Sequence, residues 1–159
     1  MKVSGDIGVI SDTHALLRPE AVRALDGCEL ILHAGDIGNS RVIPALKERA
    51  AVVAIRGNID KDPWADEYPI SEAIEVNGKF IYLIHNIGEL DLDPFGTFDA
   101  VVFGHSHQPK NEQKNGVLYF NPGSAGPRRF SLPIAVGRLT THKHGITGKI
   151  IELSVDQSA

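Results

Sequence analysis

The chain of 159 residues has one cysteine, one tryptophan and no apolar run of about 18 residues, the length that a membrane-spanning helix needs. The lone Cys28 cannot form an internal disulfide, which is usual in a reducing compartment. The first residues, MKVSGDIGVISDTH, reach polar side chains too soon for a secretory signal. We therefore expect no membrane association and a cytoplasmic protein.

Basic residues are also fewer than acidic ones: the chain has 16 Lys and Arg and 20 Asp and Glu, which gives a formal net charge of −4. Proteins that bind long nucleic acids usually carry a basic excess or a basic run, so such a partner is not expected. Charged residues at 23% and apolar residues at 42% are ordinary for a globular protein. The length suits one domain with a sizeable core, and we predict a single domain over residues 1–159.

The first third of the chain alternates strand and helix signals. Apolar runs at 7–11, 28–36 and 51–58 predict strands, and the segments between them, 18–27 and 39–49, predict helices. In the first helix, proline suits the first turn and glycine suits the position past the end. Asn39 or Ser40 would cap the second helix. A β-α-β-α-β order predicts a parallel sheet with helical crossovers.

The second half is richer in hairpin signals. Residues 73–85 contain two strand-like runs joined by an Asn-Gly turn, and a second Asn-Gly turn leads into a strand ending near 121. Residues 99–105 predict a buried strand, and 134–153 a terminal hairpin whose edge could pair with a second copy in a homo-oligomer. The expected class is therefore mixed α/β, with one or two sheets and few helices.

Five of the apolar runs are followed by a side chain that can bind a metal ion. In chain order these are Asp12 with His14, Asp36, Asn58, His85, and His105 with His107. Ligands of open α/β sheets lie at the carboxyl ends of strands, so the side chains converge if the strands are neighbours. Oxygen and imidazole ligands without thiolate favour Mn, Fe, Zn, Co or Ni. Seven ligands suit two adjacent ions, which can together clamp a phosphoryl group.

The ordered set SDTH, GD, GN, H and GHSH resembles the calcineurin-like metallophosphoesterase superfamily. The segments LILHAGD, IRGNID and NPGS (121–124) are similar to its small bacterial and archaeal phosphodiesterase branch. The resemblance runs from about residue 7 to residue 137. It implies an α/β fold of two packed mixed β-sheets flanked by helices, an αββα sandwich.

The resemblance also implies a ligand set and a reaction. Asp12, His14 and His107 would hold one divalent ion, Asn58, His85 and His105 a second, and Asp36 would bridge the two. Manganese is the first expectation for the two ions, with Fe, Zn, Ni or Co as alternatives. The implied reaction is hydrolysis of a small soluble phosphate ester, foremost a diester, by metal-bound hydroxide, with Asp36, Asn58 and His85 acting in catalysis.

Two positions depart from the family pattern. Many superfamily phosphatases carry a histidine after the GN asparagine to protonate the leaving oxygen, but Ile59 stands here. The leaving group would then need a bound water, Asp60, or good intrinsic leaving ability. Asn86 follows the lone histidine where the branch usually has glycine, and asparagine tolerates positive φ better than most residues.

Two other functions stay open. A eukaryotic trafficking subunit related to this branch uses the fold as a non-catalytic scaffold after losing part of the ligand set, which is complete here. A nucleotide-specific phosphodiesterase or phosphatase is the other alternative.

Several further side chains have both a functional and a structural interpretation. We expect His33 to be a core group that orients Asp36, and His142 and His144 to lie in a solvated hairpin turn. Arg56, Arg128 and Arg129 could bind a substrate phosphate or form surface ion pairs. Cys28 should be a buried apolar residue, and Trp64 either anchors its loop or lines the cleft.

Overall fold

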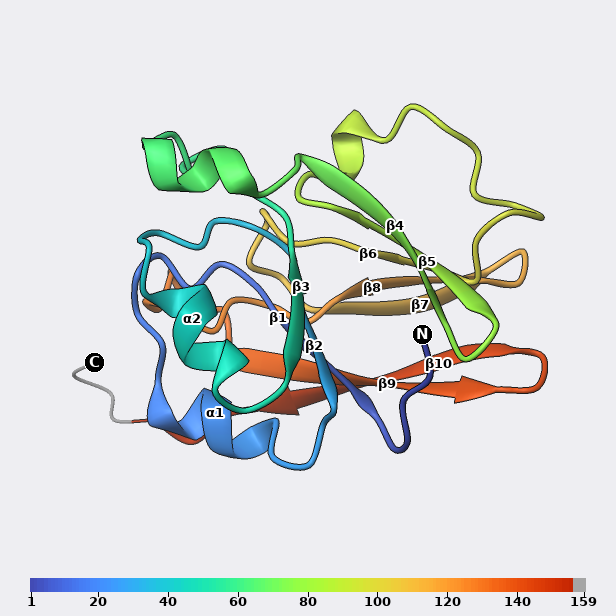
Figure 1. Cartoon of the computed structure of the whole chain (residues 1–159), viewed down its shortest axis with the longest axis horizontal. Coiled ribbons are helices and arrows are strands. Elements are labelled where there is room, and N and C mark those ends of the chain that lie inside the picture. The colour runs from blue at the N-terminus through green and yellow to red at the C-terminus, as the bar shows by residue number, and fades with distance from the viewer. Residues whose placement is uncertain (156–159) are drawn as a thin grey trace.

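Two five-stranded β-sheets packed face to face form the body of the molecule (Figure 1). The computed structural model describes residues 1–155, and residues 156–159, the end of the predicted domain, lie outside the described part. Both sheets are mixed, each with three parallel strands and two antiparallel ones. The expected two-sheet α/β fold is therefore confirmed.

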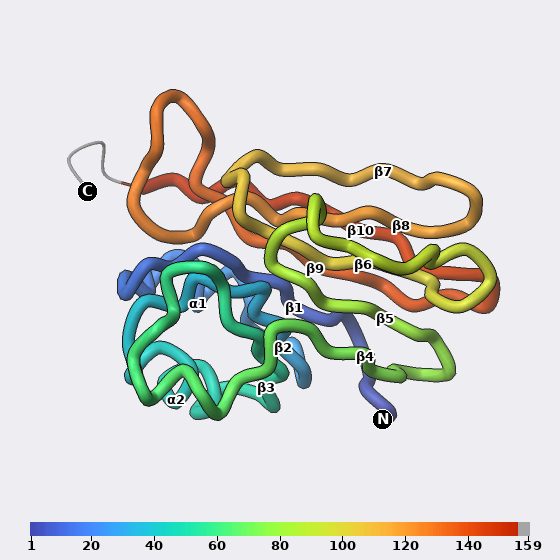
Figure 2. The backbone as a smooth tube through the Cα atoms, turned by 90° about the horizontal axis from the view of Figure 1, so that it is seen from above, coloured from blue at the N-terminus to red at the C-terminus, as the bar shows by residue number. Residues whose placement is uncertain are grey.

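The first sheet has the strand order β10-β9-β1-β2-β3. Its parallel strands are β1 (Ile7–Ile10), β2 (Leu30–His33) and β3 (Ala51–Ala54), and its antiparallel strands are β9 (Ala135–His142) and β10 (Gly145–Glu152). Helices α1 (Pro19–Ala24) and α2 (Val42–Lys47) form the crossovers. Their apolar side chains bury the outer face of this sheet, on the side of the molecule away from β7 (Figure 2).

The second sheet has the strand order β4-β5-β6-β8-β7. Strands β5 (Lys79–Ile84), β6 (Ala100–Val102) and β8 (Val117–Asn121) are parallel. Strands β4 (Ser71–Val76) and β7 (Lys110–Lys114) pair antiparallel at its two edges. Two 3₁₀ helices lie in the connections, η1 (Pro63–Glu67) and η2 (Ile87–Glu89).

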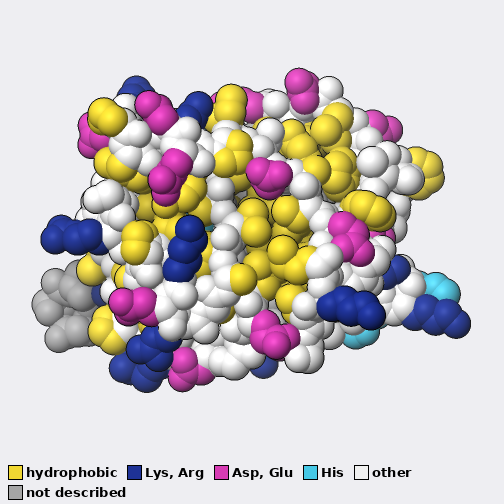
Figure 3. Space-filling model, in the orientation of Figure 1, with side chains coloured by type: hydrophobic (Ala, Val, Ile, Leu, Met, Phe, Trp, Pro, Cys, Tyr) yellow, Lys and Arg dark blue, Asp and Glu magenta, His cyan; other side chains and the backbone are white. Residues whose placement is uncertain are grey.

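Side chains alternate between the two faces of the second sheet. Ile81 and Leu83 of β5 point into the core between the sheets, where they are fully buried with Phe120. Tyr82 and Ile84 lie on the other face and pack on a smaller apolar cluster of Val101, Phe103 and Val117. Figure 3 shows hydrophobic side chains gathered in the middle and upper right of the molecule, over the part where β3 and β4 lie in Figure 1.

The predicted hairpins and helices are present, with two local corrections. The N-cap of α2 is Arg41 and makes no side-chain cap bond, so the predicted cap at Asn39 or Ser40 is wrong. The Asn39 side chain instead accepts the Arg41 N–H, which closes the turn before the helix. The second half also contains parallel pairs, because β5, β6 and β8 run side by side in one direction.

Strand β10 is an edge strand, as expected for part of the terminal hairpin. Side chains of β7 cover part of this edge. The side-chain amides of Asn111 and Gln113 in β7 donate to the carbonyl oxygens of Gly148 and Ile146, each at 2.8 Å. These two carbonyls therefore cannot accept a strand from a second copy without losing those bonds. Within residues 1–155, no helix has the length and apolar character that crossing a membrane requires.

Candidate metal centre

The carboxyl ends of five strands bring the predicted side chains to one end of the sandwich. Three of these strands, β1, β2 and β3, are neighbours in the first sheet, as the sequence predicted. The other two, β5 and β6, belong to the second sheet. The predicted residues therefore converge from both sheets, and the centre lies where the two sheets face each other.

Asp12 is fully buried and uses its two oxygens differently. Its Oδ2 accepts bonds from the Ser11 hydroxyl at 2.7 Å and from the His105 N–H at 3.1 Å. Its Oδ1 has no hydrogen-bond partner. That oxygen lies 3.4 Å from His107 Nε2 and 3.8 Å from His85 Nε2.

Asp36 also uses its two carboxylate oxygens differently. Its Oδ1 accepts the Ile59 N–H at 3.2 Å. Its Oδ2 lies 3.2 Å from His85 Nε2 and 3.6 Å from His14 Nε2. Each carboxylate thus has one oxygen held by neighbouring protein groups and one oxygen turned towards the imidazoles.

The orientation of His85 is set by the backbone. Its Nδ1 lies 2.7 Å from the Ala34 carbonyl oxygen. A carbonyl only accepts, so Nδ1 carries the proton, and in the neutral ring Nε2 is left with its lone pair. This Nε2 is buried and, despite its 3.2 Å approach to Asp36, makes no hydrogen bond of acceptable geometry. A backbone bond to one nitrogen with the other directed at carboxylates is the usual arrangement of a metal-binding histidine.

The seven predicted residues fall into two groups that share Asp12 and one further pair. Potential ligand atoms lie within 4.8 Å of one another in one group of Asp12, His14 and His107 and in a second of Asp12, Asp36 and His85. The remaining two residues form a pair, with His105 Nδ1 3.2 Å from Asn58 Oδ1. The rings of His105 and His85 are 5.2 Å apart between centroids, which joins this pair to the second group.

The two carboxylates keep their charge in this buried place. Burial acts to raise the pKa of Asp12, but the close imidazoles of His107 and His14 outweigh it and lower the pKa well below its ordinary value. For Asp36 burial likewise acts to raise the pKa, and the close imidazole of His85 brings the net pKa down. Burial would lower the pKa of His85, but Asp36 and Asp12 raise it. The centre therefore favours cations, whether protons or metal ions.

Backbone strain is concentrated on the same side chains. Five of the seven predicted residues have left-handed φ angles, which non-glycine residues seldom adopt: Asp12 (56°), His14 (47°), Asp36 (55°), His105 (72°) and His107 (63°). Such conformations are costly and persist where the surrounding structure enforces them, often at functional sites.

Two glycines of the motifs are required because side chains of the centre lie too close to them to leave room for a Cβ atom. A Cβ atom at Gly57 would lie 2.1 Å from Asp36 Oδ1, and one at Gly104 would lie 2.1 Å from the Ser11 hydroxyl and 2.6 Å from Asp12 Oδ2. The GN and GH motifs therefore need glycine so that their loops can reach the two carboxylates.

The NPGS segment ties together the loops that carry the ligands. The Asn121 side chain donates to the Gly104 carbonyl at 3.1 Å and to the Ser106 hydroxyl at 3.2 Å. The Ser124 hydroxyl donates to the Asp12 carbonyl at 3.1 Å. Both residues are buried. The sequence pointed to this segment only through the resemblance, and the contacts now explain its position.

His33 is a fully buried group beneath the centre, as expected. Its Nδ1 accepts the Gly35 N–H at 3.1 Å, so Nε2 carries the hydrogen and donates to the Thr13 hydroxyl at 3.1 Å. Thr13 in turn donates to the Ile37 carbonyl at 2.7 Å. Burial lowers the pKa of His33 to about 4, which keeps the ring neutral. These bonds flank Asp36 on both sides and fix its loop.

Asp60, one of the possible proton donors to the leaving group, has a structural role in the loops below the centre. The buried carboxylate accepts three backbone N–H groups, from Ile37 at 2.9 Å, Gly38 at 3.0 Å and Gly57 at 2.9 Å. All three bonds use the carboxylate oxygens as acceptors from the backbone. Asp60 therefore clamps the loop after β2 to the loop after β3, a role that no motif of the sequence indicates.

Asn86 needs no unusual backbone at its position. Its φ of −110° lies in the extended region, so the tolerance of asparagine for positive φ is not needed here. Its side chain accepts the Gly88 N–H at 2.9 Å and caps η2.

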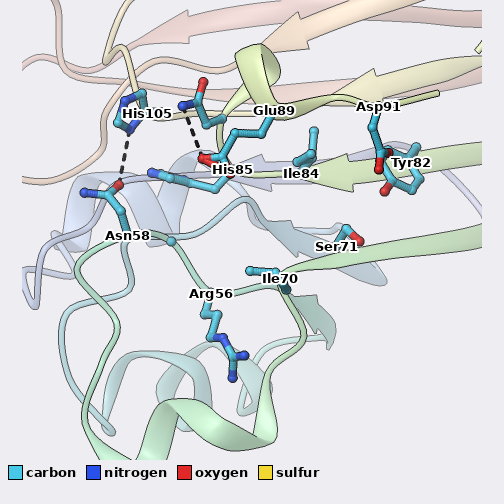
Figure 4. Close-up of a pocket in the computed structure, with 12 residues that line it drawn as sticks. Arg56, Asn58, Ile70, Ser71, Tyr82, Ile84, His85, Glu89, Asp91 and His105 are labelled. Atoms are coloured by element: carbon cyan, nitrogen blue, oxygen red, sulfur yellow. Dashed lines mark hydrogen bonds between the residues drawn. The ribbon is translucent and has the colours of Figure 1, made fainter. Parts of the chain in front are cut away.

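Two openings flank the centre. The first is a pocket of about 280 Å³ that includes Asn58, His85 and His105 (Figure 4). The second, about 170 Å³, lies against His14 and His107.

The three arginines differ in their relation to these openings. Arg128 and Arg129 line the second opening. Arg56 belongs to the lining of the first pocket, but its guanidinium turns towards the Ala65 carbonyl, at 3.4 Å (Figure 4). The Arg128 guanidinium likewise donates to a backbone carbonyl, that of Leu132, at 3.3 Å.

Other candidates lie away from the centre. His142 ends β9 and bonds Thr147 at 2.7 Å, and His144 occupies the exposed turn that follows, as predicted. Cys28 is buried among apolar residues, also as predicted. Trp64 packs on the apolar cluster beneath the helices and stacks against Tyr68, which makes it a loop anchor.

Two related proteins match most of the chain. A probable metallophosphoesterase of Methanothermobacter thermautotrophicus is 34% identical, over 80% of this chain and 81% of that protein. Phosphodiesterase YfcE of Escherichia coli is 28% identical, over 81% of this chain and 84% of that protein.

Solved structures share the fold. A novel archaeal phosphodiesterase superimposes with a TM-score of 0.75 at 24% identity, over 92% of this chain and all of that one. Vps29 of Entamoeba histolytica, in a complex with zinc, superimposes with a TM-score of 0.70 at 20% identity, over 91% and 90%. The family model for the calcineurin-like phosphoesterase superfamily domain matches residues 6–144. This match covers well over half of the sequence, and the chain belongs to the calcineurin-like phosphoesterase superfamily.

Proposed function

We propose that the protein is a dinuclear metal-dependent phosphodiesterase that acts on a small phosphate ester. The observation that carries the proposal is a set of buried polar atoms without hydrogen-bond partners. Among the described residues these are Asp12 Oδ1, His85 Nε2 and His107 Nδ1. Buried polar atoms are nearly always paired, and two of these three face the other carboxylate or imidazole groups. Cations at the centre would satisfy those two, Asp12 Oδ1 and His85 Nε2, so the donor set fits metal ions.

The proposed ligands divide as the family pattern implies. Asp12, His14 and His107 would hold one ion, and Asn58, His85 and His105 the other. Asp36 supports the role of bridge, because its Oδ2 is within 3.6 Å of His14 and 3.2 Å of His85, one from each set. Asp12 also belongs to both close groups. Nitrogen and oxygen donors without thiolate suit Mn, our first choice, as well as Fe, Zn, Co and Ni.

Two divalent ions bound here would neutralise phosphoryl charge and lower the pKa of water. The chain's own contribution is to hold the surrounding groups rigid. The Ala34 carbonyl fixes the ring of His85, and Asn58 and His105 hold each other at the exposed side of the centre. A phosphate group entering from solvent on this side would therefore meet Asn58 and His105 first, with the buried His85 behind them. We propose catalytic roles for Asn58 and His85 beside Asp36.

No imidazole stands at position 59 to protonate a leaving oxygen, and Asp60 is committed to backbone N–H groups. A missing general acid typically costs about 10²–10⁴ in rate. Aryl esters, whose leaving groups need no proton, should therefore be cleaved better than alkyl esters.

The two openings beside the centre support a diester rather than a monoester. A phosphodiester carries two substituents, and the centre has one opening of about 280 Å³ on one side and one of about 170 Å³ on the other. A monoester would fill only one of them. Phosphodiesterases among the relatives, such as YfcE of E. coli, agree with this choice.

The test combines metal content with hydrolysis. The purified protein is loaded with Mn²⁺, its metal is measured by elemental analysis, and it is assayed with an aryl phosphodiester and an aryl phosphomonoester. We expect about two metal ions per chain and faster cleavage of the diester. Two ions with a faster monoester would overturn the diesterase assignment. No bound metal and no hydrolysis would favour the scaffold role.

A further inference from the structure

The pocket beside the centre is built from two unlike surfaces. One is apolar and comes from Ile70 of the segment before β4 and from Tyr82 and Ile84 of β5. The other is acidic and comes from Glu89 and Asp91 in the connection after β5. Figure 4 shows Tyr82 and Asp91 at the end of the pocket away from His105.

This pocket is continuous with the proposed metal centre. Asn58, His85 and His105, three of the proposed ligands, belong to its lining. A phosphate ester bound at these three residues would therefore extend its substituent into the pocket. Since a strand rises about 3.4 Å per residue, the path from His85 to Tyr82 is about 10 Å long. A substituent of that length would lie along Ile84 and reach Tyr82 and Asp91.

The acidic surface is not neutralised by the protein. Neither Glu89 nor Asp91 forms an ion pair with any residue in the described range 1–155. The one arginine in the lining, Arg56, points away towards the Ala65 carbonyl and lies 3.9 Å from Asp66 (Figure 4). The only side-chain contact of Glu89 is the Asn86 amide, at 3.5 Å. Two negative charges therefore face the pocket beside an aromatic ring.

We infer that this pocket selects phosphodiesters in which one substituent has an apolar section next to the phosphate and a cationic group, an amine or quaternary ammonium, at its far end. Ile84 and Ile70 contact the apolar section, and the Tyr82 ring attracts the cation through its π face. Glu89 and Asp91 add attraction for the cation and repel an anionic substituent. The inference rests on the proposed phosphodiesterase function and names its substrate class.

Three matched esters test the inference. Each is a 4-nitrophenyl phosphodiester whose second substituent is an alkyl chain of one length, ending in a methyl, a trimethylammonium or a carboxylate group. At low ionic strength the Mn²⁺-loaded protein should show kcat/KM about tenfold higher for the cationic ester than for the anionic one, and added salt should reduce the ratio. Dissociation constants from calorimetry should show the same order, including for any ester that is bound but not cleaved.

The controls separate the pocket from general charge effects. Glu89→Gln and Asp91→Asn should each lower the cationic-to-anionic ratio of kcat/KM severalfold. Asp93→Asn removes an equal charge from the same connection, outside the pocket lining, and should keep the wild-type ratio. Equal rates and equal dissociation constants for the two charged esters would overturn the inference. Failure to cleave even the methyl ester would count against the phosphodiesterase function, while the dissociation constants would still decide the charge preference.

Discussion

His85 approaches Asp36 at 3.2 Å between Nε2 and Oδ2, yet the two atoms form no well-aligned hydrogen bond. The proton of the neutral ring is on the opposite nitrogen, where the Ala34 carbonyl binds it. A lone pair and a carboxylate oxygen therefore face each other in a buried place, an arrangement that is unfavourable unless a cation lies between or beside them. The charge balance of the centre depends on this pair.

Asp36→Asn should remove most activity and reduce the bound metal. The variant keeps an oxygen for the Ile59 N–H but replaces a charged oxygen that lies near both proposed sets of ligands. We expect hydrolysis of an aryl diester to fall by about 10³-fold or more, since metal-assisted stabilisation is worth several kcal/mol. Elemental analysis should find fewer than two ions per chain. Asp62→Asn, an exposed carboxylate at the start of η1, is the matched control. Wild-type activity with two bound ions in Asp36→Asn would refute the bridge.

His85→Ala and His142→Ala should have opposite outcomes. His85 points its free nitrogen at the centre, so its removal should abolish diester hydrolysis. His142 bonds only Thr147 at the end of β9, and its removal should leave activity within a few-fold of wild type. The measurement is kcat/KM of each variant relative to wild type, with the same Mn²⁺ loading. A loss of activity in His142→Ala would mean that the terminal hairpin contributes to the site.

The seven residues of the candidate centre were predictable because their signal is local. A polar side chain directly after an apolar run, such as Asp12 after β1 or His85 after β5, shows in the sequence without any knowledge of partners. The direction of parallel strands then requires such ends to meet. What the sequence could not show is that β5 belongs to a different sheet from β1, because the strand order depends on long-range packing.

The supporting residues were harder to predict, because their roles depend on contacts between distant loops. Asp60 lies in a polar stretch without periodicity, and its partners are backbone N–H groups rather than side chains that a sequence displays. Strand β7 was missed for another reason. Its residues, KNEQK, are all exposed and lack the apolar alternation of a half-buried strand, so only its pairing with β8 defines it.

Asp60→Asn distinguishes a structural clamp from a proton donor. The amide would present N–H groups to backbone N–H donors, leaving at least one of them buried and unpaired. We expect a loss of about 2–4 kcal/mol in the free energy of unfolding, measured by urea denaturation without metal. Asp62→Asn serves again as control and should stay within about 0.5 kcal/mol of wild type. A variant with unchanged stability and a lowered kcat would instead identify Asp60 as an acid in the reaction.

His33 should make the stability of the fold depend on pH in the acid range. Its pKa is about 4 in the folded protein, against an ordinary value of 6.5. Between these values the unfolded chain binds a proton that the folded chain does not, so stability falls as the pH drops from about 6.5 towards 4. The largest contribution from this one group is about 3 kcal/mol, and above pH 6.5 it has no further effect.

His33→Gln tests this dependence, since the amide can still donate towards Thr13 but cannot take up a proton in this range. The variant should be less stable than wild type at pH 7, because it loses the acceptor for the Gly35 N–H. The difference should narrow as the pH falls to 4, because only the wild type is then further destabilised by protonation. Urea denaturation of both proteins with a chelator, from pH 4 to pH 8, measures it, and Asp12, Asp36 and His85 contribute alike to both curves. Parallel curves across the whole range would show that His33 is protonated in the folded state as readily as in the unfolded chain, and that the Gly35–His33–Thr13 chain does not hold it neutral.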